Sequence, residues 1–437
     1  MKGSLFRLST LAYFAMMSGF LVVGCTTKED PAEVLTMCGN HSCGNLIMVT
    51  TDTSSDGFQY LDPALSPDGN TIVFTADWQA LPSTDRPPDP LPLNRQLVLV
   101  PVREGTHPET NLEASGATLI FFGFLGFDDL NLVQKGDPVW FDDTTIIFWM
   151  QTGLGNRLFA ADITSTPVIP TQITVDVTDG QPDPWYWQHV EPALSQDRKW
   201  VAYTRFGTKE ELEEIFFTNS SILVGSVETG EIFTVIEDAS TCGGATWSPD
   251  GRHIAFHASL DLIGEDGVPG TELFSVVFDT TGLAANGAVT LNNQLRRLTF
   301  TEASDGDPLT TVKNLDPTYT ADGNEIIFVS TRRAPSITLH DRNLWKIPSD
   351  GRLAPEIYFF SREDDLDPDV RVGPSREIVF SSAMGFPTEM LDRIEQETYE
   401  ENLPVVGETQ ARAIALEERE DLEFFARVMS HIFVFSP

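Results

Sequence analysis

Short runs of β-branched and aromatic residues recur along the chain, and a tight polar turn precedes each run. In the clearest copy, Ser66-Pro67-Asp68-Gly69 is followed by the apolar run TIVF at residues 71–74. In such a turn proline presets φ, aspartate bonds its own backbone and glycine accepts a positive φ. The pattern therefore predicts a β-hairpin centred on the turn, with a buried second strand.

This hairpin unit recurs six times, about every 61 residues. Five copies open with an acidic residue and a proline, and the fourth begins at Ala245 without this pair. Every copy ends in an aromatic residue. The six copies cover residues 62–74, 137–148, 191–203, 245–256, 316–328 and 367–380. Self-similarity at a regular spacing indicates a repeat architecture.

Two further β-type runs follow five of the copies. The third strands are expected at residues 96–102, 157–162, 221–227, 272–278 and 343–347. The fourth, outer strands are expected at residues 117–122, 171–177, 231–236, 295–300 and 356–360. Four antiparallel strands per unit, repeated radially, make a β-propeller. The expected fold is all-β, a six-bladed β-propeller over residues 45–385 with a C-terminal helical excursion.

The last unit supplies only two strands before the pattern changes. Residues 389–402 and 408–429 have helical apolar spacing, and residues 432–435 return to a strand pattern. We expect residues 386–437 to be a helical segment whose final strand is the third strand of blade six, with residues 46–50 as the fourth. The alternative is that the terminal helices pack on a face of the ring.

At these motifs the chain resembles the TolB-type, WD-like β-propeller repeats of bacterial envelope proteins. The acid-proline lead-in, the Ser-Pro-Asp-Gly turn and the strand ending in an aromatic residue carry the resemblance, together with Arg297-Leu298-Thr299 in an outer strand. The resemblance covers roughly residues 45–382. It implies the propeller fold and a place in the cell envelope.

The N-terminus has the pattern of a lipoprotein signal peptide. Lys2 and Arg7 precede an apolar run of 13 residues, which ends in Val22-Val23-Gly24-Cys25. Such a run is too short to span a bilayer, and small residues before a cysteine are typical of a lipobox. We expect residues 1–24 to be removed, Cys25 to be acylated and residues 25–44 to tether the propeller to the outer membrane, since residue 26 is threonine and not aspartate.

Cys38 and Cys43 lie five residues apart in this tether. In an oxidising compartment they are expected to close a small disulfide loop, and a pair of free thiols is the alternative. Cys242 has no evident partner and is expected to be a buried, small apolar residue.

The charge balance is strongly acidic, with 28 basic and 65 acidic residues and a net charge of −37. A phosphate backbone would be repelled by this charge, which excludes nucleic acid as a partner. A basic or cationic envelope protein or glycan is the expected partner.

Sequence motifs give no support to the common enzyme classes. The chain has no Gly-x-Ser-x-Gly nucleophile elbow, P-loop or dinucleotide fingerprint. We expect a non-enzymatic binding or scaffold protein. The alternative is a cation-dependent, lyase-like enzyme that acts on polysaccharide and is built on the propeller.

The acidic lead-ins allow two interpretations. They could attract cations at the channel mouth, or each could accept a hydrogen bond from the backbone of a neighbouring blade; we favour the second. These residues are Asp62, Asp137, Glu191, Asp316 and Asp367. No cofactor is expected; Ca²⁺ is the ion that such oxygen ligands suit, although no EF-hand spacing is present.

Unusual sequence gathers on the face that holds the loops before strand one and between strands two and three. Long loops are expected there at residues 77–93, 206–219 and 263–271. The aromatic run Trp185-Tyr186-Trp187 lies beside the acidic residues Asp179 and Asp183. Either the aromatic residues plug the space under a loop or they form an exposed platform for a partner.

Overall fold

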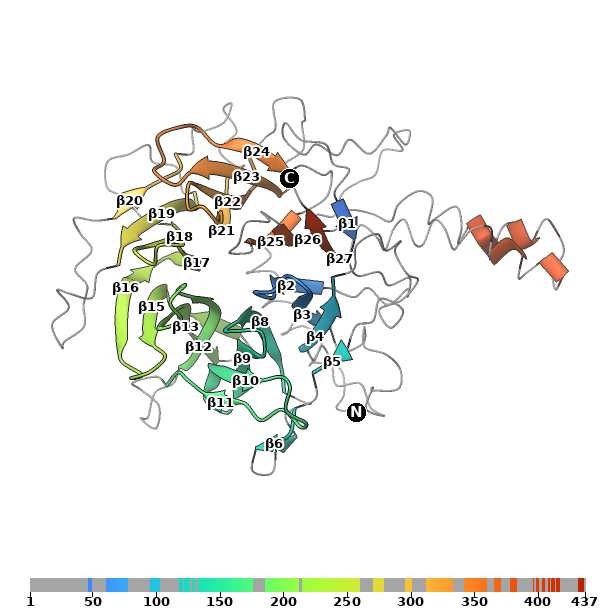
Figure 1. Cartoon of the computed structure of the whole chain (residues 1–437), viewed down its shortest axis with the longest axis horizontal. Helices are drawn as coiled ribbons and strands as arrows, with labels where there is room; N and C mark the ends of the chain where they lie inside the picture. The colour runs from blue at the N-terminus through green and yellow to red at the C-terminus, as the bar shows by residue number, and fades with distance from the viewer. Residues whose placement is uncertain are drawn as a thin grey trace.

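Antiparallel sheets stand around a common axis (Figure 1). The computed structural model describes residues 46–48, 60–77, 95–102, 118–120, 122–125, 128–129, 133–175, 185–211, 214–259, 270–278, 295–300, 312–332, 342–359, 365–370, 378–382, individual positions of 396–416, and 431–435. The predicted all-β propeller is confirmed.

Five blades are each built from a continuous stretch of chain. Their innermost strands are β2 (Tyr60–Leu65), β8 (Lys135–Trp140), β12 (Tyr186–Leu194), β17 (Thr241–Trp247) and β21 (Asn314–Tyr319). The second strands are β3 (Thr71–Asp77), β9 (Thr145–Thr152), β13 (Trp200–Glu211), β18 (His253–Ser259) and β22 (Glu325–Ser330).

The outer half of each blade follows in chain order. The third strands are β4 (Arg95–Pro101), β10 (Gly155–Asp162), β15 (Ser220–Ser226), β19 (Glu272–Val277) and β23 (Asn343–Pro348). The fourth strands are β5 (Thr118–Leu119), β11 (Thr171–Gln172), β16 (Ile232–Ala239), β20 (Arg296–Arg297) and β24 (Glu356–Phe359). Two short additions are β14 (Glu214–Phe217), which pairs with β13, and the pair β6 (Phe124–Leu125) and β7 (Asp128–Asp129).

A further four-stranded sheet joins the two ends of the chain. Its order is β25 (Asp365–Val370), β26 (Ile378–Ser382), β27 (His431–Phe435) and β1 (Leu46–Met48). This is the strand order expected from sequence for the closing unit. The innermost strands contact one another in turn, and β25 contacts both β21 and β2, so this sheet completes the ring (Figure 1).

Local chemistry explains the hairpin turns. Ser66 Oγ donates to Asp68 Oδ1 at 2.6 Å and accepts from the Thr71 N–H at 3.0 Å, while Gly69 has φ 77°. Ser248 and Asp250 repeat this arrangement. These hydrogen bonds join residues of the same hairpin, so local side chains stabilise the turn.

Apolar clusters between neighbouring sheets form the core. One cluster packs Trp247, Phe256 and Phe274 against residues of the preceding blade. The indole N–H of Trp247 donates to the Ala193 carbonyl at 3.0 Å, and that of Trp140 donates to the Ala64 carbonyl at the same distance. The two tryptophans occupy the same position in their blades, so burial and hydrogen bonding both join blades two and four to the blades that precede them.

The C-terminal excursion is helical at the positions of 396–416 that are described, and Figure 1 shows it outside the ring of sheets. No helix among the described residues is long and apolar enough to cross a bilayer.

One segment that was expected to be a loop forms strands instead. Residues 206–219 were expected to be irregular, but 206–211 continue β13 and 214–217 form β14. The glutamate-rich stretch has low β-propensity, and pairing with the strand that precedes it overrides that preference.

Candidate functional site

The acid of the acid-proline pair lies at the same point of four innermost strands. At each one the pairing with the second strand is interrupted by a β-bulge. The acids have positive φ angles, 52° at Asp62, 48° at Asp137, 53° at Glu191 and 46° at Asp316. The bulge turns each acid away from its own ladder, and proline suits the next position because it donates no ladder hydrogen bond. We call these four half-buried residues the acid collar.

The collar links blades through backbone hydrogen bonds. The Glu191 N–H donates to Asp137 Oδ2 at 2.8 Å, and the Gly244 N–H donates to Glu191 Oε2 at 2.8 Å. Thr204 Oγ1 also donates to Glu191 Oε2, at 2.7 Å. The first two are hydrogen bonds from the backbone of one blade to an acidic side chain of the blade before it, which is the structural role favoured for these acids from sequence.

Blade four departs from the pattern. Gly244 stands where the other blades carry the acid, at φ 58°, and the side chain of His257 takes over the link. The Asp316 N–H donates to His257 Nδ1 at 3.2 Å, so this nitrogen carries no proton. Burial lowers the pKa of His257, and the Glu191 carboxylate opposes that effect.

Asp62 and Asp137 hydrogen-bond to each other through their carboxyl groups. Burial raises the pKa of Asp62 well above its usual value; the Asp137 charge adds to this and Arg95 opposes it. Burial, then the Glu191 charge, raise the pKa of Asp137 to about 6. The protonated Asp62 therefore donates to Asp137, and this pair holds a proton at pH values where an exposed aspartate has lost it.

We expect Asp62→Asn to raise the free energy of unfolding by about 1–2 kcal/mol at pH 7.5, and to change it little at pH 4. Because folding raises these pKa values, the folded chain loses stability as pH rises through the interval between the unfolded pKa and the folded one. Asparagine stays neutral, still donates to Asp137 and tolerates a positive φ. Urea unfolding at the two pH values measures the difference.

Asp250→Asn is the matched control for this change. The Ser248 hydroxyl lowers the pKa of Asp250, although burial opposes it, so neutralising Asp250 should destabilise the protein at pH 7.5. If Asp62→Asn has the same sign as the control, the shared proton is refuted.

The aromatic run begins a strand. Tyr186 starts β12 and is 53% exposed, while Trp185 and Trp187 are partly buried. The Arg205 guanidinium lies 3.7 Å from the centre of the Trp187 ring. A Cβ on Gly207 would lie 3.3 Å from both the Trp185 and the Trp187 rings, so this glycine gives the two indoles their room.

Several candidate residues lie outside the part of the chain that the structure describes: Cys25, Cys38, Cys43, Asp179 and Asp183. Asp367 lies in β25, but its side chain is not described. Cys242 is buried, as expected. Where the chain is described, no three His, Cys, Asp or Glu side chains form a metal-binding group.

Sequence reasoning missed the partners of the collar. They follow the buried aromatic residue of strand two: Thr204 bonds Glu191, the Trp149 side chain bonds Asp137, and His257 bonds Asp316. Their chemistry differs from blade to blade. Only their shared offset from the aromatic residue could have signalled a common role.

No protein-family model matches the chain, and no curated protein matches it. Among solved structures it is similar to a putative TolB from Agrobacterium tumefaciens, at 15% identity over 69% of this chain and 80% of the other, with a TM-score of 0.42. An oligogalacturonate lyase from Vibrio parahaemolyticus is 13% identical over 80% and 79%, with a TM-score of 0.42. The β-propeller domain of the Trilobed protease from Pyrococcus furiosus is 11% identical over 74% and 75%, with a TM-score of 0.38.

These similarities are at the level of fold. The three proteins include a lyase and a protease domain, so they favour neither an enzyme nor a binding protein.

Proposed function

We propose that the chain is a lipid-anchored β-propeller of the cell envelope that binds a basic protein partner without catalysing a reaction. In this proposal the composite sheet counts as a sixth blade, acylated Cys25 attaches the protein to the outer membrane, and residues 25–44 form the tether. The binding face carries Trp185, Tyr186 and Trp187, and we assign to it Asp179 and Asp183, which shortly precede them in the sequence.

The observation that carries the proposal is the exposure of large apolar side chains on that face. Leu154, Val175, Tyr186 and Phe216 belong to blades two and three, and all lie at strand ends on the same side of the ring. Large apolar side chains exposed on one side of a protein are typical of surfaces that bind a partner or a ligand. The collar carboxylates, in contrast, are engaged between blades.

The alternative function is a cation-dependent enzyme that acts on polysaccharide. The Asp62–Asp137 pair favours it, because a carboxyl group with a pKa of about 6 is suited to acid–base chemistry. Loss of polysaccharide cleavage in Asp62→Asn would support this alternative, and absence of polysaccharide cleavage by the wild-type protein would remove it.

Cross-linking in membranes of cells that make the full-length chain tests the proposal. We expect the protein to stay in the membrane fraction after a salt wash and to carry a basic polypeptide with it. Cys25→Ser should move the protein to the soluble fraction. A variant that stays bound to membranes would refute the lipid anchor, and a wild-type protein without a cross-linked polypeptide would refute the binding function.

A further inference from the structure

Blade three projects beyond its neighbours. Its second strand, β13, has 12 residues, whereas the second strands of the other continuous blades have six to eight. The extra length pairs with β14, from Thr208 opposite Phe217 to Glu211 opposite Glu214. Since β12 begins opposite Thr208, the tip of this hairpin extends past the rest of the sheet.

One side of the hairpin presents aromatic and aliphatic residues. Trp187 lies opposite Gly207, and Phe216 lies opposite Lys209, so both belong to the side that also carries Trp185. Phe216 is 44% exposed.

Blade two adds Leu154 and Val175, which are 52% and 59% exposed. The turn that carries Leu154 contacts the backbone of Trp187, because a Cβ on Gly155 would lie 2.2 Å from the Trp187 carbonyl oxygen. Thr174, which precedes Val175, contacts His189 of β12 at 3.0 Å. We call Leu154, Val175, Trp185, Trp187 and Phe216 the shoulder.

The shoulder is held rigidly. The buried Arg157 donates from Nη1 to the Trp187 carbonyl at 2.6 Å, and Arg205 stacks on the Trp187 ring. On the other side of the hairpin, Phe206 and Phe217 pack with ring centres 6.3 Å apart. A braced surface loses little conformational entropy when a partner binds.

The end of the hairpin is acidic. The backbone places Glu210, Glu211 and Glu214 at the tip, with Lys209 as the single basic residue among the described positions there. The whole chain carries a net charge of −37. An apolar surface beside an acidic tip is complementary to a segment that is both apolar and basic.

The geometry points to the shoulder as the docking surface for an amphipathic, lysine- or arginine-rich segment of a protein partner. This inference rests on the binding function proposed above and adds its location and the chemistry of the bound segment. Apolar side chains of the partner would cover Leu154, Val175 and Phe216, while its basic side chains would lie over the hairpin end, whose sequence carries Glu210, Glu211 and Glu214.

Binding of synthetic peptides to the immobilised full-length protein tests this inference. The probe is a 12-residue peptide of alternating lysine and leucine, and a lysine-serine peptide of equal charge is its control. We expect the lysine-leucine peptide to bind at least about tenfold more tightly, because burial of leucine adds to the charge attraction.

The variants locate the site. Phe216→Ser and Leu154→Ser should each weaken the lysine-leucine peptide about tenfold, mainly through faster dissociation. The matched control is Leu353→Ser, which removes a 66% exposed leucine from the turn after β23 and should leave affinity unchanged. Replacing Glu210, Glu211 and Glu214 by glutamine should mainly slow association.

Equal affinity of the two peptides, or equal losses in Phe216→Ser and Leu353→Ser, would overturn the inference, as would binding of a neutral oligosaccharide in place of the peptide. The experiments distinguish a wrong location of the binding site from absence of the binding function. A polypeptide cross-linked in membranes that binds Phe216→Ser as well as wild type would keep the function and move the site.

Discussion

Deleting residues 430–437 should lower the melting temperature by about 10 °C or more, or leave the protein aggregated. The deletion removes β27, which pairs with β26 over five residues and with β1 over three. In the part of the chain that is described, β1 pairs with no other strand. The closing sheet would therefore fall from four strands to two and expose the edge of β26.

The loss should spread through the ring, because the closing sheet also holds blade one. The Leu65 N–H donates to Asp369 Oδ2 at 3.1 Å, and β2 contacts both β25 and β26. Deleting only residues 436–437, which follow β27, is the control and should leave melting unchanged.

Val434→Pro keeps the chain length and removes one N–H donor from β27, so it should destabilise in the same direction as the deletion. Calorimetry of the three variants measures the effect. Unchanged melting of both the deletion and the proline variant would show that β27 does not stabilise the ring.

The sequence predicted the parts of the fold that local chemistry determines. The Ser-Pro-Asp-Gly turns could be recognised because their hydrogen bonds lie within a few residues, as between Ser66 and Asp68. The repeat of about 61 residues located the hairpins of the blades, and β-type runs near the two chain ends predicted the strands that complete the closing sheet. Bounds of outer strands were less accurate, since these strands have one neighbour and end where that pairing ends.

The sequence pattern did not reveal which side chains pair with one another between blades. Glycine at position 244 could have been recognised as a missing acid, but nothing local indicates that His257 takes its place opposite Asp316. Similarly, the β13–β14 hairpin has the composition of a loop, and nothing local indicates that Gly207 lies against two indole rings. Such contacts depend on the packed structure, which brings distant residues together.

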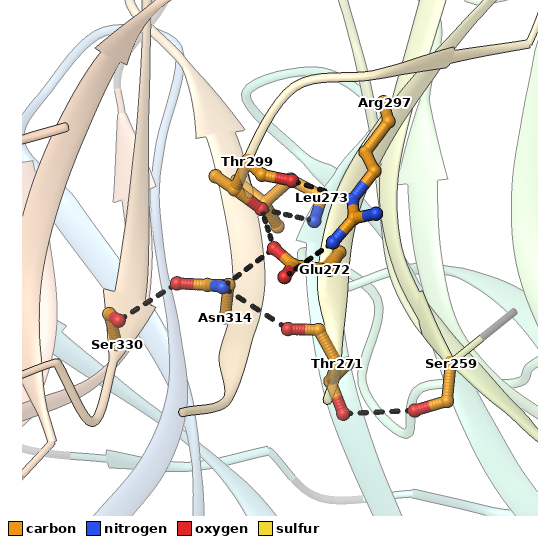
Figure 2. A network of polar contacts seen from close by, with 8 residues as sticks. All are labelled: Ser259, Thr271, Glu272, Leu273, Arg297, Thr299, Asn314 and Ser330. Atoms are coloured by element: carbon orange, nitrogen blue, oxygen red, sulfur yellow. Dashed lines mark hydrogen bonds and ion pairs between the residues drawn. The ribbon is translucent and has the colours of Figure 1, made fainter. Parts of the chain in front are cut away.

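Glu272 holds a buried polar network between blades four and five (Figure 2). Its carboxylate binds Arg297 Nη2 at 3.0 Å and accepts from Thr299 Oγ1 and, at 3.1 Å, from Asn314 Nδ2. Asn314 also accepts from Ser330 Oγ at 2.8 Å.

Equivalent strand positions carry hydrogen-bonding side chains between blades two and three. There the Leu158 N–H donates to Thr174 Oγ1 at 2.9 Å, as the Leu273 N–H donates to Thr299 Oγ1 at 2.9 Å. His189 contacts Thr174 at 3.0 Å from the next blade, in the position that Asn314 occupies in blade five. At both junctions, polar residues at equivalent strand positions thus join one blade to the next.

We therefore expect Glu272→Ala to lower the free energy of unfolding by about 3–5 kcal/mol. The change leaves the guanidinium of Arg297, whose side chain is 16% exposed, without the carboxylate that compensates for its burial. It also removes an acceptor from Asn314 and from Thr299, and each lost bond at a buried group adds to the penalty.

The exposed pair of Asp350 and Arg352 is the matched control. Its atoms are 3.1 Å apart, a distance similar to that between Glu272 and Arg297, but its side chains are 43% and 78% exposed. Water screens such a pair, so Asp350→Ala should change stability by less than about 1 kcal/mol. Urea unfolding of the full-length variants measures both changes. Similar small losses in the two variants would mean that Glu272 does not join the blades, and that apolar packing alone holds blades four and five together.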